Sequence, residues 1–260
     1  MIFLLPFPAR ILMLGSSRYT CLIATFFLIH SAESAVVLDQ IGNANIYILG
    51  PGLASAPSQI VADFPDSSSM VLDDFTVTTT GLRISSISAL FRAENGFASF
   101  SNLTAYSIAI FSAPGLAATS LTGDIANLQV MAGSGVSVAR ITGPPGGFDY
   151  GLVSLAVDIP LAAAGTYWLG IAPQTNSTIG DFRLLSNGAY VPVPPGNNDA
   201  KLANPGLELG AGALSSLGAD YAYAVATVPE PAAGLLWIIG SIRFLLRRRR
   251  PQSTYGSGEI

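Results

Sequence analysis

Four aspartates early in the chain form its densest group of side chains able to bind a metal ion. Asp63 and Asp66 flank the Phe64-Pro65 step in "ADFPDSSS", and Asp73 and Asp74 follow in "VLDDFTV". Carboxylate oxygens are the ligands that calcium favours. The spacing does not fit an EF-hand, and neighbouring residues on a strand point to opposite faces, so Asp73 and Asp74 would need a bulge to share an ion. The four aspartates are therefore a candidate calcium site, and a solvated loop leading into a strand is the alternative.

An aromatic pair, Tyr167 and Trp168, lies in the run "GTYWLGIA". Adjacent residues on a strand point to opposite faces, so one ring should face the core and the other should face outward. An outward aromatic ring beside Asp or Asn suits carbohydrate stacking, whereas core packing is the usual role of such residues in a β-sandwich. The pair is therefore a candidate carbohydrate site, with core packing as the alternative.

The residue types in the sequence give little support for an enzymatic function. The single cysteine, Cys21, and the single histidine, His30, both precede Ala35. If that segment is removed, zinc sites of Cys/His type and nucleophilic systems with a histidine base are excluded. A glycoside hydrolase needs two carboxyl groups about 5–9 Å apart, and no motif pairs Glu94 or Glu208 with a partner. We predict a non-catalytic protein without an obligatory cofactor, and we keep a carbohydrate-binding module and, less favoured, a glycoside hydrolase as alternatives.

The charge of the central segment excludes nucleic acid as a partner. Residues 35–227 contain five basic and 13 acidic residues, which gives a net charge of −8. A surface of that sign repels phosphate backbones.

Residues 1–34 are predicted to be a signal peptide that signal peptidase removes. The apolar run 21–29 is too short to span a bilayer, and Arg10 and Arg18 precede it. Ala32 and Ser34 provide small residues at positions −3 and −1 of a cut before Ala35. A translation start at Met13 would give a signal peptide of conventional length. A buried core helix is the alternative, although no polar face recurs at helical spacing.

The C-terminal segment "VPEPAAGLLWIIGSIRFLLRRRR" combines three features in a fixed order. A Val-Pro-Glu-Pro motif is followed by the apolar stretch 232–246 and an arginine cluster, and a polar tail, 251–260, ends the chain. The apolar stretch would reach about 22 Å as a helix, short of the ~30 Å hydrocarbon core, and can insert if its arginines extend to one interface. The cluster would hold that end on the cytoplasmic side of the membrane. The motif residues are Val228, Pro229, Glu230 and Pro231, and the cluster comprises Arg247, Arg248, Arg249 and Arg250.

This order of motif, short apolar helix and arginine cluster resembles the PEP-CTERM sorting signal of exopolysaccharide-producing Gram-negative bacteria. The resemblance implies that an exosortase, a membrane-embedded cysteine protease, recognises the Pro-Glu-Pro motif of residues 229–231 and cleaves there. It further implies an inner-membrane intermediate, release or relocation to the cell surface, and extracellular polysaccharide as a partner. Arg243, inside the apolar part, and the tail 251–260 depart from the family pattern. An ordinary tail anchor is the alternative.

The middle of the chain is predicted to be all-β. In "GLVSLAVDIP", Val153, Leu155, Val157 and Ile159 alternate with smaller or polar residues, and the following "GTYWLGIA" is predicted to pair with it as a hairpin. Gly/Pro-rich turns separate about eight to eleven such runs. The sequence therefore predicts an antiparallel β-sandwich of jelly-roll kind over residues 35–227.

A fainter resemblance covers this region. The stretch 58–77, "SQIVADFPDSSSMVLDDFTV", and the later "AAGTYWLGI" are similar to a recurring ectodomain of PEP-CTERM and related surface proteins. The resemblance implies a β-sandwich without a settled activity. Together the features predict an exported cell-surface or extracellular-matrix protein.

Overall fold

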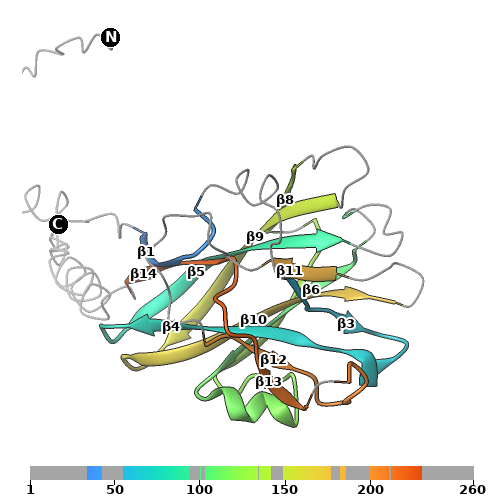
Figure 1. Ribbon diagram of the computed structural model, residues 1–260. Helices are drawn as coiled ribbons and strands as arrows, with labels where there is room; N and C mark the ends of the chain where they lie inside the picture. The colour runs from blue at the N-terminus through green and yellow to red at the C-terminus, as the bar shows by residue number, and fades with distance from the viewer. Residues whose placement is uncertain are drawn as a thin grey trace, which may run out of the picture. The chain divides into compact units, whose positions relative to one another are not determined.

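The described part of the protein is a stack of two β-sheets (Figure 1). The computed structural model describes residues 34–42, 55–93, 100, 103–133, 135–141, 149–176, 182–185 (backbone only), 199–210 and 212–229. These residues belong to one compact unit that begins at Ser34. Each sheet has seven strands, and all pairs are antiparallel except β3 with β10. The predicted all-β antiparallel sandwich is confirmed, and its jelly-roll connectivity stays a prediction.

The first sheet is built around the long strand β5. Strand β9 pairs with β5 along one edge, and β14 and then β11 pair with the other edge. Strands β1, β8 and β2 extend the sheet from β14, β9 and β11. The strands are β1 (Ala35–Asp39), β2 (Ser55–Pro57), β5 (Leu82–Ala93), β8 (Val136–Ile141), β9 (Asp149–Leu161), β11 (Phe182–Leu185) and β14 (Tyr223–Pro229).

The second sheet is built around β10, which lies between β4 and β6. Strands β12 and β13 continue from β4, β7 continues from β6, and β3 pairs with the end of β10. The strands are β3 (Ile60–Val61), β4 (Met70–Val77), β6 (Ala105–Phe111), β7 (Ala126–Met131), β10 (Gly165–Thr175), β12 (Lys201–Ala203) and β13 (Leu214–Ser216). Two 3-10 turns, η1 (Pro65–Ser67) and η3 (Pro114–Ala118), complete the elements that the structure describes.

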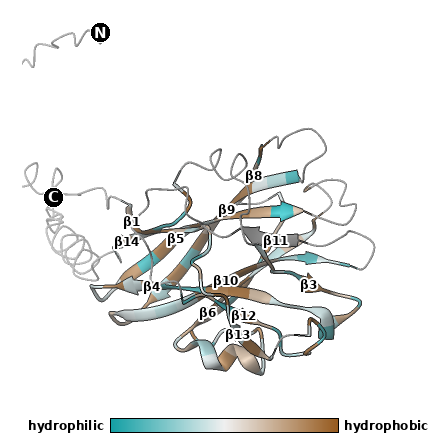
Figure 2. Ribbon diagram, viewed as in Figure 1, coloured by the Kyte–Doolittle hydropathy of each residue, from teal (hydrophilic) through white to brown (hydrophobic). Residues whose placement is uncertain are grey.

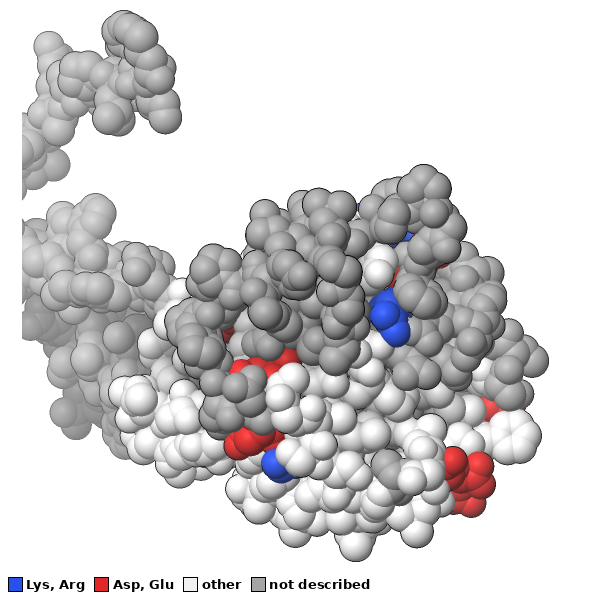
Figure 3. Space-filling view, viewed as in Figure 1, with Lys and Arg blue, Asp and Glu red and all other residues white. Residues whose placement is uncertain are grey.

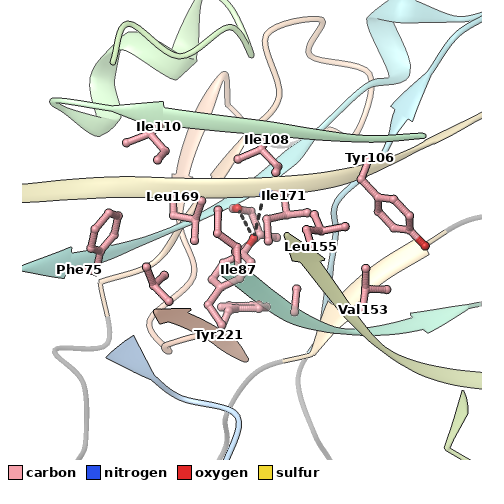
Figure 4. Close-up of a cluster of buried hydrophobic side chains, with 14 of the residues drawn as sticks. Phe75, Ile87, Tyr106, Ile108, Ile110, Val153, Leu155, Leu169, Ile171 and Tyr221 are labelled. Carbon is pink, nitrogen blue, oxygen red and sulfur yellow. Dashed lines mark hydrogen bonds between the residues drawn. The ribbon is translucent and has the colours of Figure 1, made fainter. Parts of the chain in front are cut away.

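The main core lies between the sheets and follows the predicted alternation. In β9, Val153, Leu155 and Ile159 are buried, and Ser154, Ala156 and Asp158 between them are more exposed. Val157, the fourth residue of the predicted buried face, is only partly buried. Figure 2 shows the alternation of hydrophobic and hydrophilic residues along the strands. Residues of β6 and β10 reach the same core from the opposite sheet (Figure 4). This burial is the main contribution to stability, at about 25 cal/mol per Å² of apolar surface.

The predicted hairpin of β9 with β10 is wrong. β9 pairs with β5 and β8 in the first sheet, whereas β10 pairs with β4 and β6 in the second. The connection 162–164 therefore crosses between the sheets. Strand β9 alternates in burial and β10 is buried on both faces. A strand buried on both faces belongs at the centre of a covered sheet, and a second core cluster, with Met70, Leu72 and Phe111, covers the outer face of β10.

Strands β4 and β10 separate at Val71 and Ile171, and two side chains take over their hydrogen bonds. The Tyr223 hydroxyl, from β14 of the opposite sheet, donates to the carbonyl oxygen of Val71 (2.8 Å) and accepts from the Ile171 nitrogen (3.3 Å). The Ser58 hydroxyl donates to the carbonyl oxygen of Ile171 (2.6 Å) and accepts from the Val71 nitrogen (3.2 Å). Buried backbone groups need such partners, so Tyr223 joins the two sheets by hydrogen bonds as well as by packing.

The first and last described strands, β1 and β14, are neighbours in the first sheet. Ala35 of β1 is the register partner of Thr227 of β14. Val228 and Pro229 of the predicted sorting motif are the last residues of β14 and pair with β5. The described residues contain no helix with the length and apolarity needed to cross a bilayer. Outside the described residues lie 1–33 of the predicted signal peptide, Glu230, Pro231, the apolar stretch 232–246, Arg247 to Arg250 and the tail 251–260.

Candidate functional site

Three aspartates meet where β12 begins beside β4. Asp73 and Asp74 are on β4, and Asp199 lies two residues before β12. Lys201 pairs with Leu72 in the antiparallel register, which continues to place Asp199 across from Asp74. One carboxylate oxygen of each aspartate lies within 4.8 Å of the others. That spacing suits a single cation with oxygen ligands at 2.3–2.6 Å.

Asp73 is a buried carboxylate on the inter-sheet face of β4. Its Oδ1 accepts from the backbone nitrogen of Asp74 (2.9 Å), and its Oδ2 accepts from that of Tyr221 (2.6 Å). With its amide turned so that the nitrogen faces these two acceptors, Gln40 donates to Asp73 Oδ2 (3.1 Å) and to the carbonyl oxygen of Tyr221 (2.6 Å). The bond to Asp74 turns the carboxylate along the strand. A carboxylate oxygen of Asp73 thus lies within 4.8 Å of one of Asp74 although the pairings of β4 show no register shift, and a shared ion stays a prediction.

The electrostatics of the cluster are unfavourable at neutral pH. Burial raises the pKa of Asp73 to about 8 against the effect of its hydrogen-bond donors, and the charges of Asp220 and Asp74 raise it further. Burial, followed by the charge and hydrogen bond of Asp74, raises the pKa of Asp199 to about 6, although Lys201 opposes this shift. Like charges on facing strands repel each other. A bound proton or a bound cation relieves that repulsion.

The structure places the two predicted aromatic residues on opposite faces of β10. Tyr167 faces the inter-sheet core, where its ring stacks on Phe75 with centroids 5.7 Å apart. Trp168 faces the other way and is the register partner of Asp74, and the Lys201 Nζ lies 5.9 Å from the centroid of its ring. Both rings are buried, with 7% and 9% of their surface exposed. Neither offers an open stacking face to a sugar, and Trp168 instead packs beside the carboxylate cluster.

The other two predicted calcium ligands lie in a separate turn. Asp63 follows β3, and Asp66 is in η1. Gly206, in the connection from β12 to β13, packs so closely on the backbone of Asp66 that a Cβ there would collide with it. Among the described residues, neither aspartate belongs to the carboxylate cluster, which consists of Asp73, Asp74 and Asp199. Sequence reasoning missed Asp199 because only the pairing of β12 with β4 brings it there.

Calcium binding by this cluster is tested by thermal unfolding at two pH values. At pH 9, above the raised pKa values of Asp73 and Asp199, the carboxylates are ionised. There, 10 mM calcium should stabilise the protein by about 1–3 kcal/mol if its Kd is near the 10⁻⁴–10⁻³ M of extracellular modules. At pH 5 bound protons compete, so the effect should disappear. Asp74→Asn should abolish it, whereas the matched change Asp63→Asn should leave it intact. Equal calcium effects in both variants would contradict a site at Asp73, Asp74 and Asp199.

The cluster does not have the arrangement of a glycosidase acid–base pair. Asp73 is fully buried and its oxygens accept from backbone and amide donors, so it cannot contact a sugar ring. Glu208 is exposed, and its Oε2 accepts a long bond from the Ser67 hydroxyl (3.5 Å). Glu94 lies outside the described residues.

Comparison with known proteins gives no match: no family model, no curated protein and no solved structure matches the chain.

Proposed function

We propose that the chain is an exported, non-catalytic protein of the bacterial cell surface or extracellular matrix, sorted by its C-terminal segment. Signal peptidase removes residues 1–34. The apolar stretch 232–246 then holds an inner-membrane intermediate, oriented by the arginine cluster 247–250. An exosortase-type protease recognises the motif around Glu230 and passes the folded domain to the cell surface. Extracellular polysaccharide is the proposed partner there.

The bounds of the β-sandwich are the observation that carries this proposal. β1 begins at Ala35, the first residue after the predicted signal-peptide cut, and β14 ends at Pro229, inside the predicted sorting motif. The last buried residue of β14 is Thr227, and Val228 and Pro229 are progressively more exposed. Among the residues that the structure describes, cleavage at both predicted positions would therefore remove no buried residue.

The charge distribution supports the same proposal. On the face drawn in Figure 3, most of the described surface is uncharged, and the acidic and basic side chains form small separate groups. The described pairs Arg83–Asp158 and Arg140–Asp149, at 2.5 Å and 2.6 Å, use two of the few basic residues on local contacts. Such a surface suits a structural or adhesive role among neutral and weakly acidic polymers better than steering of charged ligands.

The sorting step is tested by one substitution in the motif. In the native host, Glu230→Ala should leave a precursor with its C-terminal segment in the membrane fraction, because the protease no longer recognises the motif. The matched change Glu259→Ala, in the polar tail, should be processed like the natural chain. Immunoblots of membrane, surface and medium fractions provide the measurement. Identical processing of Glu230→Ala and the natural chain would contradict the proposal.

A further inference from the structure

A cavity of about 500 Å³ opens between Tyr106 of β6 and residues 132–133 on one side and strand β8 of the other sheet. Its described walls are mostly apolar, and come from Phe100, Leu103, Val136 and Val138. The Phe100 ring lies directly on Gly151 of β9, where any side chain would displace it. The absence of a side chain at residue 151 thus fixes one wall of the cavity.

Tyr106 of β6 provides a polar group in this cavity. The residue is 1% exposed, and among the described residues its hydroxyl has no hydrogen-bond partner. Figure 4 shows the hydroxyl pointing away from the cluster around Ile108 and Ile110. Burial raises the pKa of Tyr106 above its usual value, so the hydroxyl is a neutral donor at physiological pH. A buried hydroxyl without a partner is costly, and a ligand in the cavity would satisfy it.

The walls restrict the chemistry of that ligand. Arg140 is the only charged residue among the described walls, and it is held by Asp149 at 2.6 Å. A sugar would bury several hydroxyl groups against apolar walls that offer few partners, at a cost for each unpaired group. An apolar body with one hydrogen-bond acceptor matches the walls and the Tyr106 hydroxyl. The volume lies in the range of small-molecule sites.

We propose that this cavity binds a small, largely apolar carbonyl compound, of aryl or acyl type, whose oxygen accepts a hydrogen bond from Tyr106. The ligand lies between β6 and β8, against Phe100 and Leu103. This site is distinct from the carboxylate cluster at β4 and β12, and its existence does not depend on the sorting of the chain.

Photolabelling of the full-length chain with benzophenone, a neutral aryl ketone, tests the proposal. Irradiation should attach one probe per chain, and mass spectrometry should locate it on peptides containing residues 100–106 or 132–141. At subsaturating probe, Tyr106→Phe should reduce labelling about fivefold, the factor that one neutral hydrogen bond is worth. Ala132→Phe, which places a ring in the cavity from an exposed position, should abolish labelling at these peptides.

Tyr167→Phe is the matched control, because its hydroxyl donates to the Ala163 carbonyl oxygen (2.7 Å) away from the cavity. It should label like the natural chain. Far-UV circular dichroism verifies that each variant folds. Labelling scattered along the chain, or equal labelling of Tyr106→Phe and the natural chain, would overturn the proposal.

Discussion

Replacing Tyr223 with phenylalanine is expected to lower the free energy of unfolding by about 2–4 kcal/mol. The change removes only the hydroxyl, but that group donates to Val71 and accepts from Ile171 where β4 and β10 separate. The residue is completely buried, so water does not replace the lost partner. Each buried backbone group left unpaired costs about 1–3 kcal/mol, and partial closure of the two strands recovers some of this loss.

Urea unfolding of the natural chain, Tyr223→Phe and Tyr167→Phe measures this effect. Tyr167→Phe is matched because it also removes one tyrosine hydroxyl from β-structure, but it breaks a single bond to Ala163. Its expected loss is about 1 kcal/mol. Equal stability losses in the two variants would show that the Tyr223 hydroxyl does not join the sheets.

The stability of the protein is expected to fall as the pH rises from 5 to 8. Burial raises the folded-state pKa of Asp73 to about 8 from the ordinary 3.8. The stabilisation linked to its bound proton is therefore complete when the pH is below the unfolded-state pKa of Asp73. It is lost as the pH rises through the folded-state pKa. Where the folded state holds one more proton than the unfolded state, the free energy of unfolding falls by at most about 1.4 kcal/mol per pH unit. Asp199, with a pKa raised to about 6, adds to the slope at the acidic end.

Unfolding free energies of Asp73→Asn between pH 5 and 8 isolate this contribution. The variant should show a much flatter profile, because the amide does not ionise. Asp158→Asn is the control, because the pKa of Asp158 is shifted in the opposite direction. The hydrogen bond from Arg83 lowers the pKa of this exposed carboxylate, so the stability that it contributes is lost only as the pH falls toward that lowered pKa. The slope between pH 5 and 8 should persist in Asp158→Asn. A rise in stability over that range in the natural chain would refute the assignment.

Local patterns predicted the strands but not their partners. The alternation of Val153, Leu155 and Ile159 identified β9 and its buried face, and turn residues marked its ends. The same runs predicted a hairpin of β9 with β10, because closeness in the chain favours local pairing. Burial of both faces of β10 instead gives it a central place in the opposite sheet.

The sequence predicted only part of the candidate site for a similar reason. Asp73 and Asp74 were conspicuous as neighbours, whereas Asp199 joins them only through the register of β12 on β4. Asp63 and Asp66 are closer in sequence to Asp73 but belong to a separate turn. The Tyr106 cavity had no sequence signal, because an apolar wall and a packed core have the same composition.

The most direct test of the whole account is the intact mass of the protein recovered from its native host. Two processing events around a self-contained β-sandwich predict a mature chain that begins near Ala35 and ends near Pro229. A recovered chain that still carries residues 247–260, or one that retains residues 1–34, would contradict it.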